Sequence, residues 1–261
     1  MTTNQFIAVA GPSGSGKTNW ISQAIQASNQ PCFYLAPGVN EHSIDLMRMG
    51  YSFPDLQIVS DTDIPAYINL WRQEGLANAT VYLEIGFHLV LDHPMLSVLP
   101  WHQVAVVPPQ LSDSEWHRWA DEIITGNDTA LITEAQTPNL WLTSLKGQVF
   151  DPPSVNEILM ELVAGAYGEI HRVKGIFELP DGKGFYIDFV QGMSDMGYVE
   201  LKIPRWLKGR PDRPSGIEVV GWNLQSAAIA QTLKDSYLTD DLLNYYQQQY
   251  QATLEEEGLP I

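Results

Sequence analysis

The chain has 261 residues, of which 44% are hydrophobic and 17% charged, so it can bury a core in one large or two small domains. This composition excludes a disordered tail and a fibrous protein. With 31 acidic and 14 basic residues, the formal net charge of -17 argues against nucleic-acid binding over a broad surface. The single cysteine, Cys32, cannot form an intramolecular disulfide, and we find neither a membrane-spanning run nor a signal peptide, so we expect a cytoplasmic protein.

Short apolar runs alternate with longer helical patterns over the first 165 residues. Strands are expected at 5–10, 31–36, 56–60, 80–84, 103–107 and 130–133. Helices are expected at 17–27, 64–74, 112–124 and 154–165. This alternation predicts an α/β domain, residues 1–165, whose parallel sheet carries helices on both faces.

Extended segments dominate the rest of the chain. Strands are expected at 169–179, 184–192, 197–203 and 217–222, followed by a helix at 225–237. This pattern predicts a small C-terminal α+β domain, residues 166–261, which ends in a polar tail that forms a further helix.

The segment 11–18 carries the chemistry of the first domain. It reads Gly-Pro-Ser-Gly-Ser-Gly-Lys-Thr and matches the P-loop pattern G-x-x-x-x-G-K-[ST] between an apolar strand and an amphipathic helix. Backbone N–H groups of such a loop converge on phosphate oxygens, and glycines allow the close approach. Lys17 would stabilise phosphate charge, and the Thr18 hydroxyl would ligate Mg²⁺. The residues expected to bind a nucleoside triphosphate are Gly11, Ser13, Gly14, Ser15, Gly16, Lys17 and Thr18.

An acidic residue at the end of a neighbouring buried strand would complete this site. Glu84 ends the apolar run 81–83 and precedes Ile85-Gly86. It is a candidate for positioning the metal or the attacking water, and an ordinary carboxylate at a strand end is the alternative.

With these motifs the chain resembles the CobW-like family of P-loop GTPases, many of which are metallochaperones or metal-insertion proteins. The segment 40–45 is similar to the family's Asn-Glu-Phe-Gly stretch with the Ile-Asp that follows, and 84–86 is similar to its Glu-Thr-x-Gly strand end. In the second half, 171–177 resembles the Arg-x-Lys-Gly strand that opens the family's C-terminal domain, and 219–224 resembles its Phe-x-Gly-x-x-Leu strand.

The resemblance implies a P-loop NTPase-like first domain whose nucleotide state changes a switch segment, residues 38–45. It places Glu41 and Asp45 in that segment, close to Mg²⁺ and the γ-phosphate. Glu41 would then join Lys17 and Glu84 in catalysis, and Asp45 would join Thr18 at the metal. The implied cofactors are Mg²⁺ and GTP, with ATP as the alternative.

Two signatures of the family are missing. Its Cys-x-Cys-Cys motif is replaced by residues 58–63, which contain no thiol, so a zinc-thiolate site is excluded there. Asp61 and Asp63 in this interval are oxygen donors that suit Mg²⁺ or Mn²⁺, but we favour a helix N-terminus. The family's guanine-binding Asn-Lys-x-Asp is also absent after 104–107, where Pro-Pro-Gln follows. GTP preference is therefore lost or transferred to another residue.

A transition metal has few candidate ligands outside that interval. His88, Asp92 and His93 cluster after Glu84, but two histidines five residues apart do not share a helix face as an i, i+4 pair would. We favour surface or partly buried histidines over a metal site.

One basic segment interrupts the acidic background. It is a candidate docking surface for an acidic client protein or for a second copy of the chain, and a solvated loop is the alternative. Within residues 202–213 it contains Lys202, Arg205, Lys208, Arg210 and Arg213.

The sequence therefore predicts nucleotide binding and slow Mg²⁺-dependent hydrolysis, coupled to metal delivery or to assembly of a client protein. The alternative is a non-catalytic, nucleotide-responsive adaptor or assembly factor that has lost thiolate metal binding and guanine recognition. A small-molecule kinase is disfavoured, because the first domain offers only Arg48, Arg72 and Arg118 for a lid around the phosphates.

Overall fold

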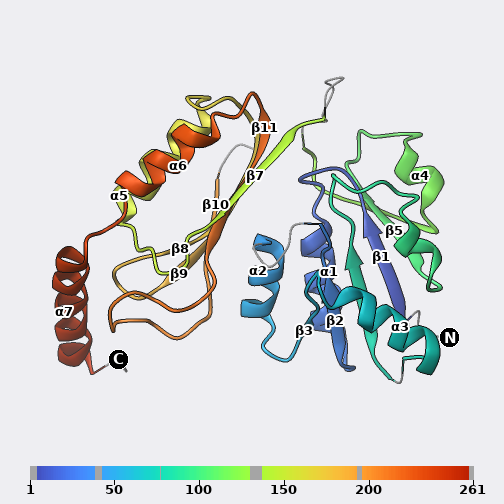
Figure 1. Ribbon diagram of the computed structural model, residues 1–261, viewed down its shortest axis with the longest axis horizontal. Coiled ribbons are helices and arrows are strands. Elements are labelled where there is room, and N and C mark those ends of the chain that lie inside the picture. The colour runs from blue at the N-terminus through green and yellow to red at the C-terminus, as the bar shows by residue number, and fades with distance from the viewer. Residues whose placement is uncertain (1–4, 39–42, 77, 130–136, 193–195, 259–261) are drawn as a thin grey trace. The chain divides into compact units, whose positions relative to one another are not determined.

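The computed structural model describes residues 5–38, 43–76, 78–129, 137–192 and 196–258 (Figure 1). The chain divides into two compact units, Met1–Leu131 and Ile132–Ile261. Each unit has its own sheet and its own hydrophobic core.

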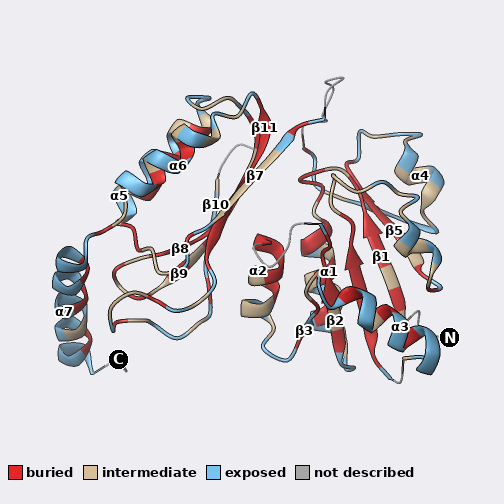
Figure 2. Ribbon diagram, in the orientation of Figure 1, coloured by how far each residue is buried: buried red, intermediate tan, exposed pale blue. Residues whose placement is uncertain are grey.

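The first unit is built on a sheet of six parallel strands. Their order across the sheet is β3-β2-β4-β1-β5-β6. The strands are β1 (Phe6–Ala10), β2 (Cys32–Leu35), β3 (Gln57–Ile58), β4 (Thr80–Glu84), β5 (His102–Val107) and β6 (Glu122–Thr125). The strands β1 and β5 are largely buried (Figure 2), as expected of parallel strands that are covered on both faces.

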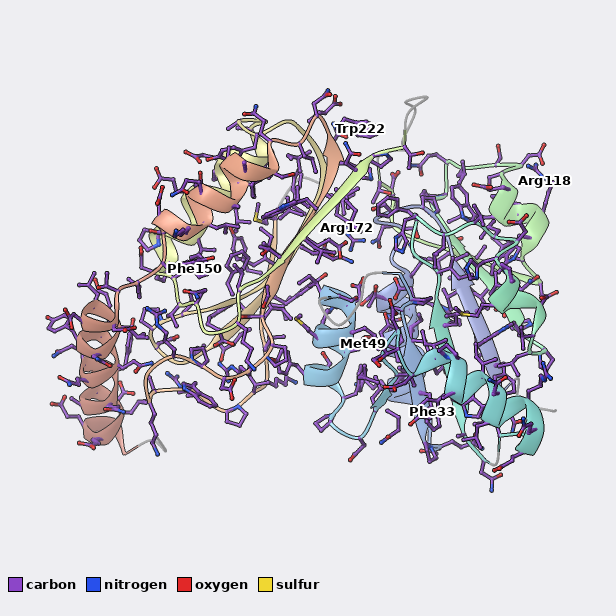
Figure 3. All side chains as sticks on the ribbon, viewed as in Figure 1. Phe33, Met49, Arg118, Phe150, Arg172 and Trp222 are labelled. Atoms are coloured by element: carbon purple, nitrogen blue, oxygen red, sulfur yellow. The ribbon has the colours of Figure 1, made fainter. Side chains whose placement is uncertain are left out.

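Helices cover both faces of this sheet, which confirms the predicted α/β class. On one face, α1 (Lys17–Ala27) and α2 (Ile44–Ser52) share a core with Val9 and Tyr34. On the other face, α3 (Ile64–Glu74) packs through Trp71 against Phe33, which is labelled in Figure 3. The short helices η2 (Pro94–Ser97) and α4 (Glu115–Trp119) add further apolar side chains to this second core.

Two elements of the first unit differ from the prediction. The helix expected at 112–124 is wrong in its second half: α4 ends at Trp119, and β6 pairs with β5. The β-branched Ile123 and Ile124 favour a strand there. The helix α2 was not predicted; Ser43 caps it by accepting a hydrogen bond from the Leu46 N–H. The strand expected at 130–133 lies outside the described residues.

The second unit has an antiparallel sheet of five strands, in the order β10-β9-β8-β11-β7. The helices α5 (Pro152–Val163) and α6 (Ser226–Asp235) contribute Leu159 and Ile229 to one core with Val173 and Ile217 of the sheet. This arrangement confirms the predicted α+β class. The strands are β7 (Asn139–Ser144), β8 (Glu169–Glu178), β9 (Gly184–Val190), β10 (Gly197–Glu200) and β11 (Gly216–Trp222).

The predicted domain boundary at residue 165 falls inside this second unit. β7 and α5 precede that residue, yet β7 pairs with β11, and Leu159 of α5 lies in the core described above. No strand was predicted at 139–144, and the helix predicted at 154–165 would have the same local pattern in either unit, so periodicity could not assign it.

The basic loop 202–213 is largely bonded within its own unit. Arg210 Nε donates to Asp240 Oδ1 at 2.7 Å, and Arg213 Nε donates to Glu178 Oε1 at 2.6 Å. Arg205 Nη1 donates to the Asp181 carbonyl at 3.1 Å. Arg210 also donates to the Leu238 carbonyl, just before the last helix, α7 (Asp240–Glu257). Two of the five basic side chains, Arg210 and Arg213, are paired with carboxylates, so the candidate docking surface reduces to the exposed Lys202, Arg205 and Lys208.

Among the described helices there is none whose length and hydropathy would let it cross a lipid bilayer.

Candidate functional site

The P-loop joins β1 to α1 at the carboxyl end of the parallel strands, which is where ligands bind to sheets of this kind. Gly11, Gly14 and Gly16 have φ angles of 148°, 79° and 99°, which L side chains rarely adopt. A Cβ atom on Gly11 would lie 2.1 Å from the Val106 carbonyl oxygen. The loop therefore favours glycine at these three positions, of which the sequence pattern specifies Gly11 and Gly16.

Asn127 holds the loop from the segment that follows β6. Its Nδ2 donates to the Gly14 carbonyl at 3.1 Å, and its backbone N–H donates to the Ser15 carbonyl at 2.9 Å. Asn127 was not among the predicted site residues, because a helix was expected in the preceding segment. A Gly-Asn pair directly after a strand was the available signal.

The P-loop contains several buried polar side chains. Lys17 Nζ donates to the carbonyl oxygens of Gly11 and Pro12, both at 3.0 Å. Ser13 and Ser15 are buried, and Ser15 Oγ has no hydrogen-bond partner among the described residues. A buried ammonium group, a buried hydroxyl and glycine backbone at a helix N-terminus are the groups that bind phosphate in proteins.

Thr18 brings two carboxylates together. Its Oγ1 lies 3.0 Å from Glu84 Oε1 and 3.4 Å from Asp45 Oδ1. Glu84 ends β4 and is in register with Val9 of β1, while Asp45 lies in the first turn of α2. All three side chains are buried. Two buried negative charges repel each other, and carboxylate and hydroxyl oxygens are the ligands that Mg²⁺ prefers, so this set of oxygens fits a divalent cation such as Mg²⁺.

Tyr34 reaches the same carboxylate from β2. Its hydroxyl donates to Glu84 Oε2 at 2.7 Å. Burial, followed by the negative charges of Glu84 and Asp45, raises the pKa of Tyr34 well above its ordinary value, so the phenol stays protonated and remains a donor. Tyr34 was not among the predicted site residues, because a tyrosine in a buried strand has the pattern of a core residue.

The structure places the remaining acidic candidates as follows. Glu41 lies outside the described residues. Asp61 accepts a hydrogen bond at 3.0 Å from the backbone N–H of Gly38, where the predicted switch segment begins. Asp63 precedes α3 at the predicted helix start, but its side chain makes no cap bond and instead accepts from Ser60 Oγ.

No group of three or more His, Cys, Asp or Glu side chains in the described ranges is placed to hold a metal ion. His88, Asp92 and His93 therefore form no metal centre. His88 packs instead between the segments that follow β2 and β4. Its Nε2 lies 3.2 Å from the Pro37 carbonyl, and its ring occupies the space beside Gly38 and Gly86.

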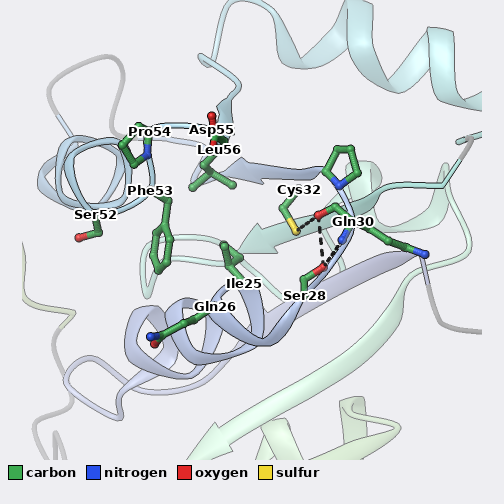
Figure 4. Close-up of a pocket in the computed structure, with 11 residues that line it drawn as sticks. Ile25, Gln26, Ser28, Gln30, Cys32, Ser52, Phe53, Pro54, Asp55 and Leu56 are labelled. Carbon is green, nitrogen blue, oxygen red and sulfur yellow. Dashed lines mark hydrogen bonds between the residues drawn. The ribbon is translucent and has the colours of Figure 1, made fainter.

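A pocket of about 530 Å³ lies at the opposite, amino end of the strands (Figure 4). The end of α1, the start of β2 and residues 52–56 line it, and Cys32 donates to the Gln30 carbonyl in its wall. Because the strands are parallel, this pocket is separate from the P-loop edge of the sheet. It contains none of the predicted site residues.

Comparisons with known proteins match the second unit to a family. The sequence model described as the cobalamin synthesis protein cobW C-terminal domain matches residues 144–236. This match confirms the resemblance to CobW-like proteins that the second half of the sequence carries, and it begins before the predicted boundary at residue 165. No curated protein matches the chain.

Two solved structures are similar to the chain. They are a Zn(II)-bound YjiA GTPase from E. coli, at 10% identity, and a Zn(II)-bound triple mutant of YjiA GTPase, at 11% identity. Each match covers 90% of this chain and 99% of the other, with a TM-score of 0.33.

Proposed function

Since the chain carries a CobW C-terminal domain behind a P-loop unit, we propose that it binds a nucleoside triphosphate with Mg²⁺ and hydrolyses it slowly. The observation that carries this proposal is the contact of the Thr18 hydroxyl with both Asp45 and Glu84 beside the P-loop. A P-loop threonine and acidic side chains on a neighbouring strand and a nearby helix are the parts that such a site needs.

The residues take distinct roles in this proposal. The loop 11–16 binds the phosphates through its backbone N–H groups, and Lys17 exchanges its carbonyl partners for phosphate oxygens. Thr18 and Asp45 hold Mg²⁺, which when bound neutralises charge on the phosphates. Glu84 positions the metal through its contact with Thr18, and together with Glu41, as the resemblance implies, it orients the attacking water. Hydrolysis is slow, because no arginine of the first domain belongs to a motif that would stabilise the transferred phosphoryl group.

The second unit links nucleotide state to a client. We propose that GTP is preferred over ATP and that the cycle drives metal delivery or assembly of a client protein in the cytoplasm. The support for this step is the CobW C-terminal domain match. The exposed Lys202, Arg205 and Lys208 are the remaining basic contacts for an acidic client.

A non-catalytic adaptor is the second candidate function. Two features of the sequence favour this candidate: the thiolate motif and the guanine-binding motif of the family are both missing. Such a protein would keep the phosphate cradle and change conformation on binding, without turnover.

Binding and turnover of GTP and ATP by the purified chain test both candidates, with and without Mg²⁺. We expect Mg²⁺-dependent binding that Lys17→Ala lowers by at least tenfold. Lys234→Ala, an exposed lysine of α6, is the matched control and leaves binding unchanged. Turnover supports the hydrolase, and binding without turnover supports the adaptor. If neither nucleotide binds, both candidates are wrong.

A further inference from the structure

We infer that Tyr34 is a positioning residue, whose hydroxyl fixes the Glu84 carboxylate so that its other oxygen faces Thr18. This inference rests on the proposed nucleotide and Mg²⁺ site and names a residue that the P-loop pattern does not include. Tyr34 acts through Glu84, so it touches neither phosphate nor metal in this account.

The strand pairing explains how the contact forms. β2 lies beside β4, with Tyr34 in register with Tyr82, two residues before Glu84. Side chains two residues apart on a strand point to the same face, so Tyr34, Tyr82 and Glu84 share the face that α1 covers. From this position the Tyr34 hydroxyl reaches Glu84 Oε2 at 2.7 Å.

Packing holds the tyrosine in place. Tyr34 is fully buried within the core formed by α1, α2 and the sheet, in a cluster with Val9, Ile21 and Met49. A side chain locked in this way delivers its hydroxyl to one point, which a solvent-exposed donor would not do.

The second hydrogen bond determines the orientation of the carboxylate. Thr18 engages Oε1 and Tyr34 engages Oε2, so both oxygens of Glu84 are held. Without the phenol, Oε2 would stay buried but would lose this hydrogen-bond donor. The carboxylate would then no longer be fixed in its present orientation. Removal of an outer hydrogen-bond partner of this kind typically lowers metal affinity or activity by about 10–100-fold.

Tyr82 provides a matched control. It is the residue opposite Tyr34 in the ladder, it is buried, and it faces the same side of the sheet. Burial, followed by Cys32, raises the pKa of Tyr82 to about 12, and Glu84 is not among the causes of this shift. Tyr82→Phe therefore removes a buried phenol from the same core without removing the bond to Glu84.

The experiment compares Tyr34→Phe, Tyr82→Phe and the unaltered chain in Mg²⁺ titrations of nucleotide binding, with nucleotide affinity in EDTA as a second readout. For Tyr34→Phe we expect about a tenfold increase in the Mg²⁺ concentration at half-saturation, with affinity in EDTA unchanged. Tyr82→Phe should match the unaltered chain. A merely structural role would lower affinity in EDTA as well.

The Glu84→Gln variant completes the test as a double-mutant cycle. If Tyr34 acts through Glu84, adding Tyr34→Phe to Glu84→Gln changes the Mg²⁺ requirement no further. Equal behaviour of Tyr34→Phe and the unaltered chain, or an equal loss in Tyr82→Phe, overturns this inference alone. Absence of Mg²⁺-dependent nucleotide binding in the unaltered chain overturns the proposed function and this inference with it.

Discussion

Backbone geometry at single residues determines whether the P-loop can form. Gly11 combines a φ of 148° with a carbonyl 2.1 Å from where its Cβ would lie, whereas Gly147 has a φ of 77° and open space around it. We expect Gly147→Ala to cost about 1–2 kcal/mol of unfolding free energy from backbone strain alone. Gly11→Ala should cost at least about 2 kcal/mol more and abolish nucleotide binding, because the Val106 backbone must move. Urea unfolding of the two variants checks this, and equal losses would contradict it.

At the scale of elements, β8 buries titratable side chains and makes stability depend on pH. His171 is 1% exposed and packs edge-on against Trp222 of β11, which is labelled in Figure 3. Burial, with a smaller contribution from Arg172, lowers the pKa of His171 below its ordinary value of 6.5. The folded chain therefore binds this proton less readily than the unfolded chain. Neutral His171 therefore leaves the free energy of unfolding at its full value above pH 6.5. This free energy decreases as the pH falls through 6.5 towards the lower pKa of His171 in the folded chain.

This pH dependence is measurable by thermal unfolding between about pH 7.5 and pH 5.5, above the range in which ordinary carboxylates titrate. We expect the midpoint temperature of the second unit to fall with pH, and the slope to decrease in His171→Gln. His102→Gln, in the first unit, is the control that should leave this slope unchanged. A slope that is identical in His171→Gln would show that this histidine is not the cause.

At the scale of the whole molecule, the net charge of -17 opposes folding through self-repulsion. Salt screens this repulsion, with a Debye length of about 10 Å at 0.1 M. Buried pairs such as Lys174 with Glu218, at 3.0 Å between β8 and β11, are screened much less. We therefore expect the midpoint temperature to rise as NaCl increases from about 0.05 M to 0.5 M. Sucrose at matched osmolality is the uncharged control, and a fall in midpoint temperature with salt would mean that ion pairs outweigh the repulsion.

Local sequence was enough to predict the elements around the P-loop. The helices α1 and α3 and the strand β4 begin and end at the predicted residues, because hydrophobic periodicity and the Gly-Lys-Thr chemistry act over a few neighbours. Glu84 and Asp45 were also found as candidates, from a strand end and from a family resemblance. The role of Glu41 stays a prediction, since it lies outside the described residues.

Only the folded chain determined which residues meet. Thr18 contacts Asp45 and Glu84, which are 27 and 66 positions away, and Tyr34 bonds to Glu84 across 50 positions. These side chains come into contact only when β2, β4 and β1 pair in register. Strand pairing is not encoded in any local pattern of the sequence. The same reason explains why β7 belongs to the second sheet, where it pairs with β11. At β6, the β-branched Ile123 and Ile124 favour a strand locally, and pairing with β5 stabilises it.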